Sequence, residues 1–477
     1  MASFRVLGVA LAAVVLASTG EAQRGGGRGG NPLARFLSVD TNLVALTNAR
    51  IIDGTGAPAR AGQTLVIRDG NIVALGPAAS TQVPPGAQVI DLTGKSVIPG
   101  LVMVHEHLYY PSGGNTYGNY SASFPILYLA GGVTSMRTGG NTNGYGEIEV
   151  ARAINAGRAP GPWIDATAPY LQMVGMNIAQ MHNLKDADEA RRMVNFWADA
   201  GATSFKAYMH ISRDALRAAI YEVHKRGLRI TGHLCSVTYR EAAEMGIDNL
   251  EHGFFASTDF VANKAPDACP GQNQGQQTIR ALNPADPRFT SLVAELVRRN
   301  VALTSTLAVF ETFTPGRPLP RGLEVLTPQL RESYEARHAI TARSPNSIYT
   351  ELYPRAAALE VAFARAGGLL IAGTDPTGGG GVIPGYSNQR TVELLVEAGF
   401  TPLEAIRICT LNGATFLRRA DRVGSIAVGK QADLVVIGGD PSARIADIRN
   451  VEIVFRNGLG FSPDSLINSV RGRVGLF

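Results

Sequence analysis

Residues 203–253, TSFKAYMHISRDALRAAIYEVHKRGLRITGHLCSVTYREAAEMGIDNLEHG, decide the fold class of this chain. Three runs within them, SFKAYM, RITGHL and NLEHG, have the length of short buried strands. Between the first two runs, residues 213–226 repeat apolar residues at the spacing of an amphipathic helix. Strands that alternate with helices in this way are typical of an α/β protein with a parallel sheet.

The alternation continues on both sides of this stretch, over about residues 100–420. Five further runs predict strands: GLVMVHEH (100–107), GVTSMRTGG (132–140), WIDATAPYL (163–171), VALTSTL (301–307) and LLIAGTDPT (369–377). Eight strands that alternate with helices predict a (β/α)8 or TIM barrel. A doubly wound sheet is the alternative, but no Gly-x-Gly-x-x-Gly motif follows the first strand.

Two β-rich segments flank the predicted barrel. Residues 41–98 contain short β-branched runs punctuated by Asp-Gly and Gly-Lys turns, and the same pattern returns in residues 421–460. We therefore predict one small β-sandwich built from both ends of the chain. The barrel then occupies residues 99–420. Residues 461–477 form a C-terminal tail, and a docking helix at its start is the alternative to an extended segment.

The N-terminus has the pattern of an export signal. Arg5 precedes the apolar run 6–18, which is too short to span a bilayer, and residues 20–22 offer a small-x-small cleavage site. We expect a signal peptide over residues 1–22, followed by a flexible Gly/Arg linker over residues 23–40. The mature protein is then periplasmic or secreted, with no membrane attachment after cleavage. An uncleaved membrane anchor is the alternative.

The distribution of charge argues against nucleic-acid binding, and the number of cysteines argues against a fold held together by several disulfides. The net charge is +5, but the basic residues are scattered without a helix-long stripe, so we predict no nucleic-acid partner. The three cysteines, Cys235, Cys269 and Cys409, are an odd number and lie far apart. We therefore predict no disulfide framework, and we expect Cys235 and Cys409 to be buried thiols.

Three connections are candidates for the walls of a site. Residues 263–288 and 311–350 are long and contain proline, and we predict that they are loops over the site that define substrate access. Residues 109–123, YYPSGGNTYGNYSAS, are rich in Tyr, Gly and Asn. They are either a solvated loop or part of a pocket for aromatic or peptide-like substrates.

Two histidines end the first predicted barrel strand. His105 and His107 are two residues apart, and side chains at this spacing share one face of a strand. Both imidazoles can therefore reach one metal ion, while Glu106 points away. A helical His-Glu-x-x-His protease motif is excluded by this geometry. Two ordinary core histidines are the alternative.

Other polar residues lie at the ends of later strands. The chain holds eight histidines, and His233 and His252 follow the runs RIT and NLE, where the carboxyl-terminal rim of a barrel is expected. Asp375 ends the eighth run. Its alternative role is the N-cap of a helix that begins at Pro376.

Lys206 lies inside the apolar run SFKAYM. A buried, unpaired ammonium is costly, so this lysine needs a partner or a lowered pKa. A deprotonated lysine can react with carbon dioxide to form a carbamate, an anion able to bridge two cations. A lysine paired with a buried acid is the alternative.

Taken together, these segments resemble the amidohydrolase superfamily, and within it the imidazolonepropionase-like and Xaa-Pro dipeptidase-like branch of metal-dependent hydrolases. The resemblance covers nearly all of the mature chain. It runs through the segments RIIDGTG, VIPGLVMVHEH, SFKAYM, ITGHL, NLEHG, AGTDP, ATFL and GKQADLVV.

The resemblance implies two divalent metal ions, for which zinc fits the mixed imidazole and carboxylate donors. By the family pattern His105, His107 and Asp375 hold the first ion, and His233 and His252 hold the second. A carboxylated Lys206 and a hydroxide bridge the two, and Asp375 carries the proton to the leaving amine. A homo-oligomer is compatible with the resemblance.

Tyr208 follows Lys206 by two residues and is expected to face the same way. We predict that it donates a hydrogen bond to the substrate or the oxyanion. Ordinary packing with the hydroxyl in solvent is the alternative.

The predicted function is hydrolysis of an amide bond in a small-molecule or peptide-like substrate, a dipeptide or an N-acyl amino acid. Hydrolysis of a cyclic amide, carbamate or ester, including a xenobiotic, is the second hypothesis, because the same metals serve all these reactions. A non-catalytic barrel that keeps a structural metal is the third. A closed structural site, however, needs neither a bridging lysine nor a free aspartate.

Overall fold

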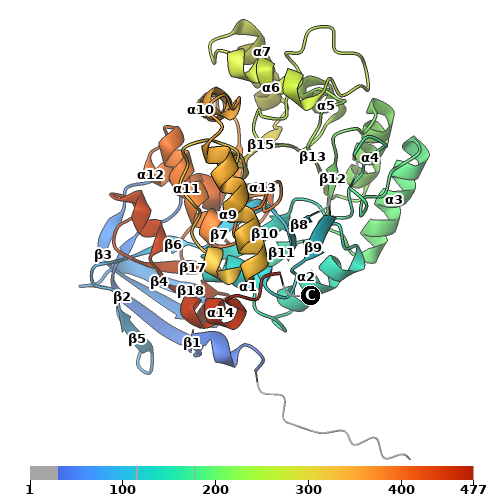
Figure 1. Ribbon diagram of the computed structural model, residues 1–477. Helices are drawn as coiled ribbons and strands as arrows, with labels where there is room; N and C mark the ends of the chain where they lie inside the picture. The colour runs from blue at the N-terminus through green and yellow to red at the C-terminus, as the bar shows by residue number, and fades with distance from the viewer. Residues whose placement is uncertain (1–30, 114–115, 177, 476–477) are drawn as a thin grey trace, which may run out of the picture.

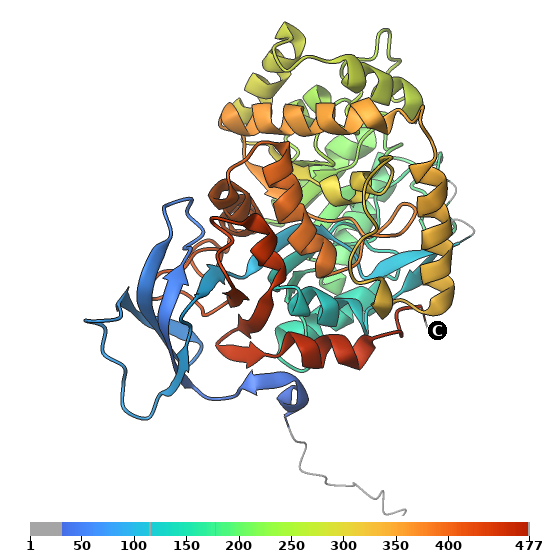
Figure 2. The same ribbon diagram turned by 60° about the vertical axis from the view of Figure 1, so that its left-hand side comes forward.

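The computed structural model describes residues 31–113, 116–176 and 178–475 (Figures 1 and 2). The predicted signal peptide and the first part of the predicted linker lie outside these ranges. The rest of the linker is ordered, so the prediction of a flexible segment up to residue 40 is wrong there. Ala34–Phe36 form the 3-10 helix η1, and Leu37–Val39 form β1, which pairs with β19 (Leu459–Phe461). Phe36 is buried, and its burial fixes the segment.

The two ends of the chain build one sheet of nine strands. Its order is β1-β19-β18-β17-β6-β2-β3-β4, and β5 pairs with β2. The strands not yet given are β2 Leu43–Ile51, β3 Arg60–Arg68, β4 Asn71–Pro77, β5 Gln88–Asp91, β6 Lys95–Pro99, β17 Leu434–Gly438 and β18 Val451–Arg456. Both ends of the chain thus contribute strands. These strands are hydrogen-bonded into a single sheet rather than divided into two.

This sheet has a hydrophobic core of its own. Strand β2 pairs with β5 over its first half and with β6 over its last residues. Asp69 and Gly70 form the tight turn between β3 and β4, and both have positive φ, as this type of hairpin turn requires. Figures 1 and 2 show the sheet to one side of the larger unit.

The larger unit contains all eight strands predicted for the barrel. They are β7 Leu101–Glu106, β10 Val133–Thr138, β11 Trp163–Asp165, β12 Ser204–Ala207, β13 Arg229–Gly232, β14 Asn249–Glu251, β15 Ala302–Ser305 and β16 Leu370–Ala372. All pair in parallel, in the orders β11-β10-β7 and β12-β13-β14-β15-β16. Most of their residues are buried, as in strands covered on both faces.

The two parallel sheets meet at two junctions. At one junction, Thr167 forms an isolated parallel bridge with Ser204. At the other, the backbone N–H groups of Thr374 and Asp375 donate to the carbonyl oxygen of His105 at 3.2 and 3.0 Å. The strands therefore follow one another in chain order, but the regular pairing is divided between a three-stranded and a five-stranded sheet.

Helices follow the strands and surround them (Figure 1). They are α1 Phe124–Ala130, α2 Tyr145–Asn155, α3 Ala187–Ala200, α4 Arg213–Lys225, α5 Tyr239–Met245, α6 Gln272–Ala281, α7 Pro287–Arg298, α8 Leu307–Glu311, α9 Pro328–Ala342, α10 Tyr349–Arg365, α11 Tyr386–Ala398, α12 Pro402–Arg407 and α13 Gly413–Phe416. Short turns η2 Leu323–Val325, η3 Ile408–Asn412 and η4 Ile445–Arg449 complete them. None of the helices described is both long and apolar enough to cross a membrane.

Three connecting segments contain regular structure, and two of them differ from their predictions. The spans 263–288 and 311–350 are not simple loops, because they contain α6 and α9. Residues 109–119 include a hairpin of β8 (Tyr109–Gly113) and β9 (Thr116–Asn119).

The predicted tail is structured as well. Pro463–Val470 form α14, which packs against α1 and buries Leu466. Burial of this apolar face explains why the segment is ordered.

Candidate metal centre

The six side chains predicted to hold metal lie together at the carboxyl ends of parallel strands. They are His105 in β7, His107 directly after β7, Lys206 in β12, His233 after β13, His252 after β14, and Asp375 after β16. All six line one cavity of about 470 Å³. The structure therefore brings all six residues together, although they come from both parallel sheets.

His105, His107 and Asp375 form the tightest group. One ligand atom from each lies within 4.8 Å of the others. The Nε2 atom of His107 lies 3.1 Å from Oδ1 of Asp375, and Nε2 of His105 lies 3.8 Å from the same oxygen. Two imidazoles and a carboxylate at these distances fit a divalent cation such as zinc.

The other ring nitrogen of each of three histidines has a hydrogen-bond partner outside the cavity. Nδ1 of His105 lies 2.7 Å from Glu251, Nδ1 of His107 lies 3.4 Å from the carbonyl of Gly140, and Nδ1 of His252 lies 2.9 Å from the hydroxyl of Thr306. Partners of this kind fix the tautomer and direct Nε2 toward a metal. His233 stands beside His252, with 4.2 Å between the ring centroids.

The electrostatics suit cation binding. Burial lowers the pKa of His107 to about 4 and that of His233 to about 3, so both imidazoles are neutral near pH 7 and keep a free lone pair. Burial alone raises the pKa of Asp375, but His105 and His107 outweigh it and hold this pKa well below its usual range. The site thus offers neutral imidazoles and an ionised carboxylate.

Asp375 does not cap a helix. The next helix, α11, begins at Tyr386, which excludes the alternative role at Pro376. Asp375 has a φ of 56° and His252 a φ of 68°, so both residues are held in the left-handed region that residues other than glycine rarely occupy. Such backbone strain persists only where the surrounding structure enforces it, and it is concentrated at functional sites.

Glu106 anchors the backbone beside Asp375. It points away from the cavity, as predicted, and accepts hydrogen bonds from the backbone N–H of Thr374 at 3.0 Å and from the side chain of Asn388 at 3.0 Å. A third bond comes from the hydroxyl of Thr374. The middle residue of the His-Glu-His motif thus supports the strand end that carries Asp375.

Lys206 is buried next to the histidines. Its Nζ lies 3.2 Å from Nε2 of His105, and within the described ranges it forms no ion pair with a carboxylate. No described carboxylate therefore forms the direct ion pair that the alternative, a lysine paired with a buried acid, requires. Burial lowers the pKa of Lys206 to about 8, despite the opposing effect of Glu251 and Asp375. A pKa of about 8 leaves a neutral fraction of about one tenth at pH 7, far more than for an exposed lysine.

Glu251 and Arg137 were missed by the sequence analysis. Glu251 binds Nδ1 of His105 with one oxygen and the guanidinium of Arg137 with the other, at 3.1 Å. Arg137 is buried and also donates to the hydroxyls of Ser204 and Thr231 at 2.6 and 2.9 Å. The sequence did show an acid and an arginine inside apolar strands, which is a sign of a buried ion pair. It did not show that the two pair with each other and with His105.

Tyr208 lines the same cavity as Lys206. Its ring lies 5.0 Å from that of His233 and 4.8 Å from that of Tyr170. Tyr109 and Tyr117 of the β8–β9 hairpin also line the cavity, so the Tyr-rich segment forms part of a pocket rather than only a solvated loop. The catalytic role of Tyr208 stays a prediction.

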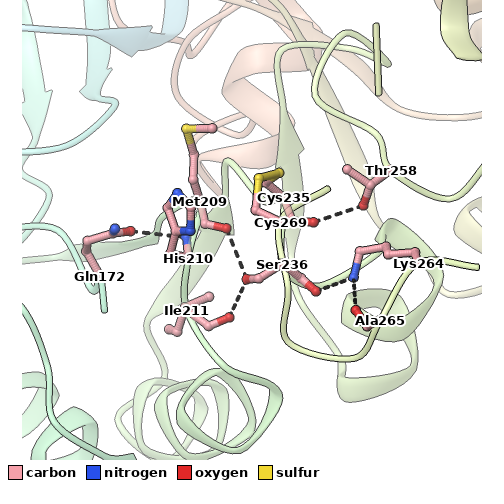
Figure 3. Close-up of a disulfide and its surroundings, with 10 residues drawn as sticks. All are labelled: Gln172, Met209, His210, Ile211, Cys235, Ser236, Thr258, Lys264, Ala265 and Cys269. Atoms are coloured by element: carbon pink, nitrogen blue, oxygen red, sulfur yellow. Dashed lines mark hydrogen bonds between the residues drawn. A yellow bond between two sulfur atoms is a disulfide. The ribbon is translucent and has the colours of Figure 1, made fainter. Parts of the chain in front are cut away.

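Cys235 and Cys269 form a disulfide, so the prediction that Cys235 is a buried thiol is wrong (Figure 3). Their Cα atoms are 4.9 Å apart although 34 residues separate them in the chain. Spacing alone did not reveal the pair, because the segment before α6 has to fold back over the end of β13. Cys409 is a buried free thiol, as predicted.

The disulfide is one of several ties on the segment that follows His233. The hydroxyl of Thr258 donates to the carbonyl of Cys235 at 3.0 Å (Figure 3). The hydroxyl of Ser236 reaches the carbonyl of Ile211 at 2.6 Å, and the ammonium of Lys264 donates to the carbonyl of Ser236. These bonds join the rim of the cavity to the ends of neighbouring strands.

Reduction of this disulfide is expected to lower the free energy of unfolding by about 3–4 kcal/mol, because it frees a loop of 34 residues in the unfolded chain. Denaturant unfolding of the wild type with and without dithiothreitol measures the change. In the Cys269→Ser variant, dithiothreitol should have no further effect. Equal stability of the oxidised and reduced wild type would contradict the expectation.

Comparison with known proteins gives relatives over most of the chain. The model of the amidohydrolase family matches residues 323–459. The imidazolonepropionase of Sphingopyxis alaskensis is 25% identical over 416 residues, which are 83% of this chain and 89% of that protein. The dihydroorotase of Mycobacterium tuberculosis is 24% identical over 405 residues, or 80% and 85% of the two chains. A solved structure of a candidate prolidase from Bifidobacterium longum superposes with a TM-score of 0.65 and 25% identity, over 90% of this chain and 99% of the other.

Proposed function

Because this chain belongs to the amidohydrolase superfamily, whose members hydrolyse carbon–nitrogen bonds with the help of metal ions, we propose that it cleaves an amide bond in a dipeptide or an N-acyl amino acid. The observation that carries the proposal is the convergence of His105, His107 and Asp375, with Lys206 beside them. We further propose that the eight parallel strands act as one (β/α)8 barrel with this site at its carboxyl end.

Two divalent cations, zinc in our proposal, complete the site. His105, His107 and Asp375 would hold one ion, and His233 and His252 would hold the other. When bound, the cations supply Lewis acidity and lower the pKa of water toward ~7. The neutral His107 and His233 and the ionised Asp375 need no proton loss before binding, which favours occupancy at neutral pH.

Lys206 would enter the site as a carbamate. Its neutral Nζ attacks the carbon of carbon dioxide, a C–N bond forms, and one N–H proton is released to solvent. The product carries a negative charge where an ammonium would repel cations. The lowered pKa of Lys206 and the absence of a paired carboxylate among its described neighbours support this step.

Asp375 would carry the proton during hydrolysis. Its carboxylate faces the cavity, and Thr377 holds one oxygen at 2.7 Å. It accepts a proton from the attacking water and gives it to the leaving amine. Tyr208 would donate a hydrogen bond from its hydroxyl to the substrate carbonyl oxygen.

Hydrolysis of a cyclic amide, carbamate or ester is the second candidate. The imidazolonepropionase and dihydroorotase among the relatives favour it, because neither name denotes a dipeptidase. A cavity of about 470 Å³ has room for either a linear or a cyclic small substrate.

We also propose that the protein is exported. The disulfide between Cys235 and Cys269 supports this location, because disulfides persist mainly in oxidising compartments.

Metal analysis and a substrate screen test the proposal together. Protein prepared without chelators should contain two divalent metal ions per chain by mass spectrometry of the digested sample. It should release free amine from dipeptides or N-acyl amino acids faster than it opens lactones or cleaves aryl carbamates. If this protein contains no bound divalent metal, the proposed metal centre is rejected. Turnover restricted to cyclic amides, carbamates or esters selects the second candidate.

A further inference from the structure

The cavity above the metal centre has two aromatic walls. The tyrosine wall lies beside His107 and His233 and consists of Tyr109, Tyr117, Tyr170 and Tyr208. The phenylalanine wall lies beside His252 and consists of Phe255, Phe310, Phe313 and Tyr349. The tyrosine wall presents hydroxyl groups, whereas the phenylalanine wall is mainly hydrocarbon.

Three separate segments build the phenylalanine wall. Phe255 follows β14, Phe310 lies in α8, and Tyr349 begins α10. The rings of Phe255 and Phe310 are stacked, with centroids 3.7 Å apart and an interplanar angle of 8°. Tyr349 lies 6.4 Å from Phe310 at an angle of 22°, and its hydroxyl accepts a hydrogen bond from Gln276 at 3.0 Å. Stacking and this bond hold the rings in place before a ligand arrives.

The phenylalanine wall lies within one side chain of the metal centre. The ring of Phe310 is 5.9 Å from that of His252, which faces it edge-on. A substrate whose carbonyl group is bound at His252 therefore places its neighbouring substituent against Phe310. The phenylalanine wall is therefore close enough to contact the group next to the bond that is cut.

Charge is confined to the floor of the cavity. Among the described residues that line it, the only Arg, Lys, Asp or Glu side chains are Lys206 and Asp375, both in the metal centre. A charged substituent on the phenylalanine wall would lose its hydration without gaining a partner. An uncharged ring, in contrast, gains stacking and buried apolar area there.

We propose that the phenylalanine wall is a subsite for an aromatic ring attached next to the scissile amide bond. The proposal rests on the proposed function, and it narrows the substrates to amides that carry an aromatic group beside the bond. Recognition requires the ring itself, whether it belongs to the acyl group or to the leaving amine.

Two matched substrate pairs test the subsite in the metal-loaded enzyme. N-acetyl-L-phenylalanine and N-acetyl-L-alanine differ by a ring on the amine side, and N-phenylacetylglycine and N-acetylglycine differ by a ring on the acyl side. We expect kcat/KM to be about tenfold higher for the aromatic member of one pair, the magnitude that stacking and burial of a ring supply. The pair that shows the preference identifies the side of the bond.

The Phe310→Ala variant should reduce this ratio to about threefold or less, while kcat/KM for the small substrate stays within about threefold of the wild type. If Phe310 had only a structural role, its replacement would lower kcat/KM for both substrates by the same factor. Phe196→Ala is the control, because this exposed aromatic on α3 lies outside the cavity. Phe255→Ala replaces the variant at Phe310 if that protein does not fold. An unchanged ratio in the variant, or no aromatic preference in either pair, would overturn the proposal.

A binding measurement separates failure of the subsite from failure of the proposed function. Metal-free wild type is titrated with phenylacetamide and with acetamide, and binding is followed by ligand-observed NMR. We expect phenylacetamide to bind about tenfold more tightly, and Phe310→Ala to remove the difference. If the metal-loaded enzyme hydrolyses none of the four substrates, the proposed hydrolysis of N-acyl amino acids fails, yet this measurement still decides the subsite. Equal binding of the two amides would reject it.

Discussion

Replacement of Asp375 by Asn is expected to lower kcat by about 10²–10⁴-fold, the range for loss of a positioned proton carrier. The asparagine side chain would keep the shape of the aspartate and one carbonyl oxygen, but it cannot accept a proton. The bond from Thr377 and the left-handed backbone are compatible with asparagine, which tolerates positive φ. The fold should therefore survive, and the loss should be in kcat.

Steady-state kinetics and metal analysis on the same preparation check this expectation. Asp214→Asn is the matched control, because the Asp214 side chain is 84% exposed on α4 and does not line the cavity. Full activity of the Asp375→Asn variant with its metals in place would show that Asp375 carries no proton. Loss of one metal together with activity would instead assign it only the role of a ligand.

Replacement of Lys206 by Ala is expected to lower kcat/KM by about 10²-fold or more and to leave fewer than two metal ions per chain. The physical reason is the loss of the anion that would lie between the two cations. Lys206 is buried at the floor of the cavity, next to His105, so the change leaves a gap of the size of a small carboxylate.

That gap allows a rescue experiment, which distinguishes a bridging role of Lys206 from a purely structural one. Added propionate or acetate should restore metal content and at least part of the activity of the Lys206→Ala variant, because the carboxylate replaces the carbamate. The control is Lys225→Ala, whose side chain is 65% exposed on α4 and which should match the wild type. A Lys206→Ala variant that binds two metals normally refutes the bridging role.

Much of the fold was predictable because its signals are local. Each of the eight parallel strands is a short buried run, and burial on both faces leaves a continuous apolar stretch that can be read without knowing the partner strand. The helix at Arg213–Lys225 followed from its apolar spacing. The ends of these elements then placed His105, His107, Lys206, His233, His252 and Asp375 on one rim.

The errors concern contacts between distant segments. The ordered segment at Leu37–Val39 depends on pairing with β19, at the other end of the chain. The helix α14 was one of the possibilities for the last segment, but its packing against α1 was not predicted. The helices α6 and α9 lie in spans that proline and length had marked as loops. Local composition carries little information about a segment whose order comes from burial against another part of the chain.

The sequence by itself determined the type of chemistry and the strand ends that carry it, since ligand type and strand periodicity are properties of neighbouring residues. Only the tertiary structure decided how the site is supported and shaped. It joined Glu251 to His105 and Arg137, tied Cys235 to Cys269, and set Phe255, Phe310 and Tyr349 into one wall. Each of these contacts joins residues from different elements, and their distances exist only after the strands have paired and the helices have packed.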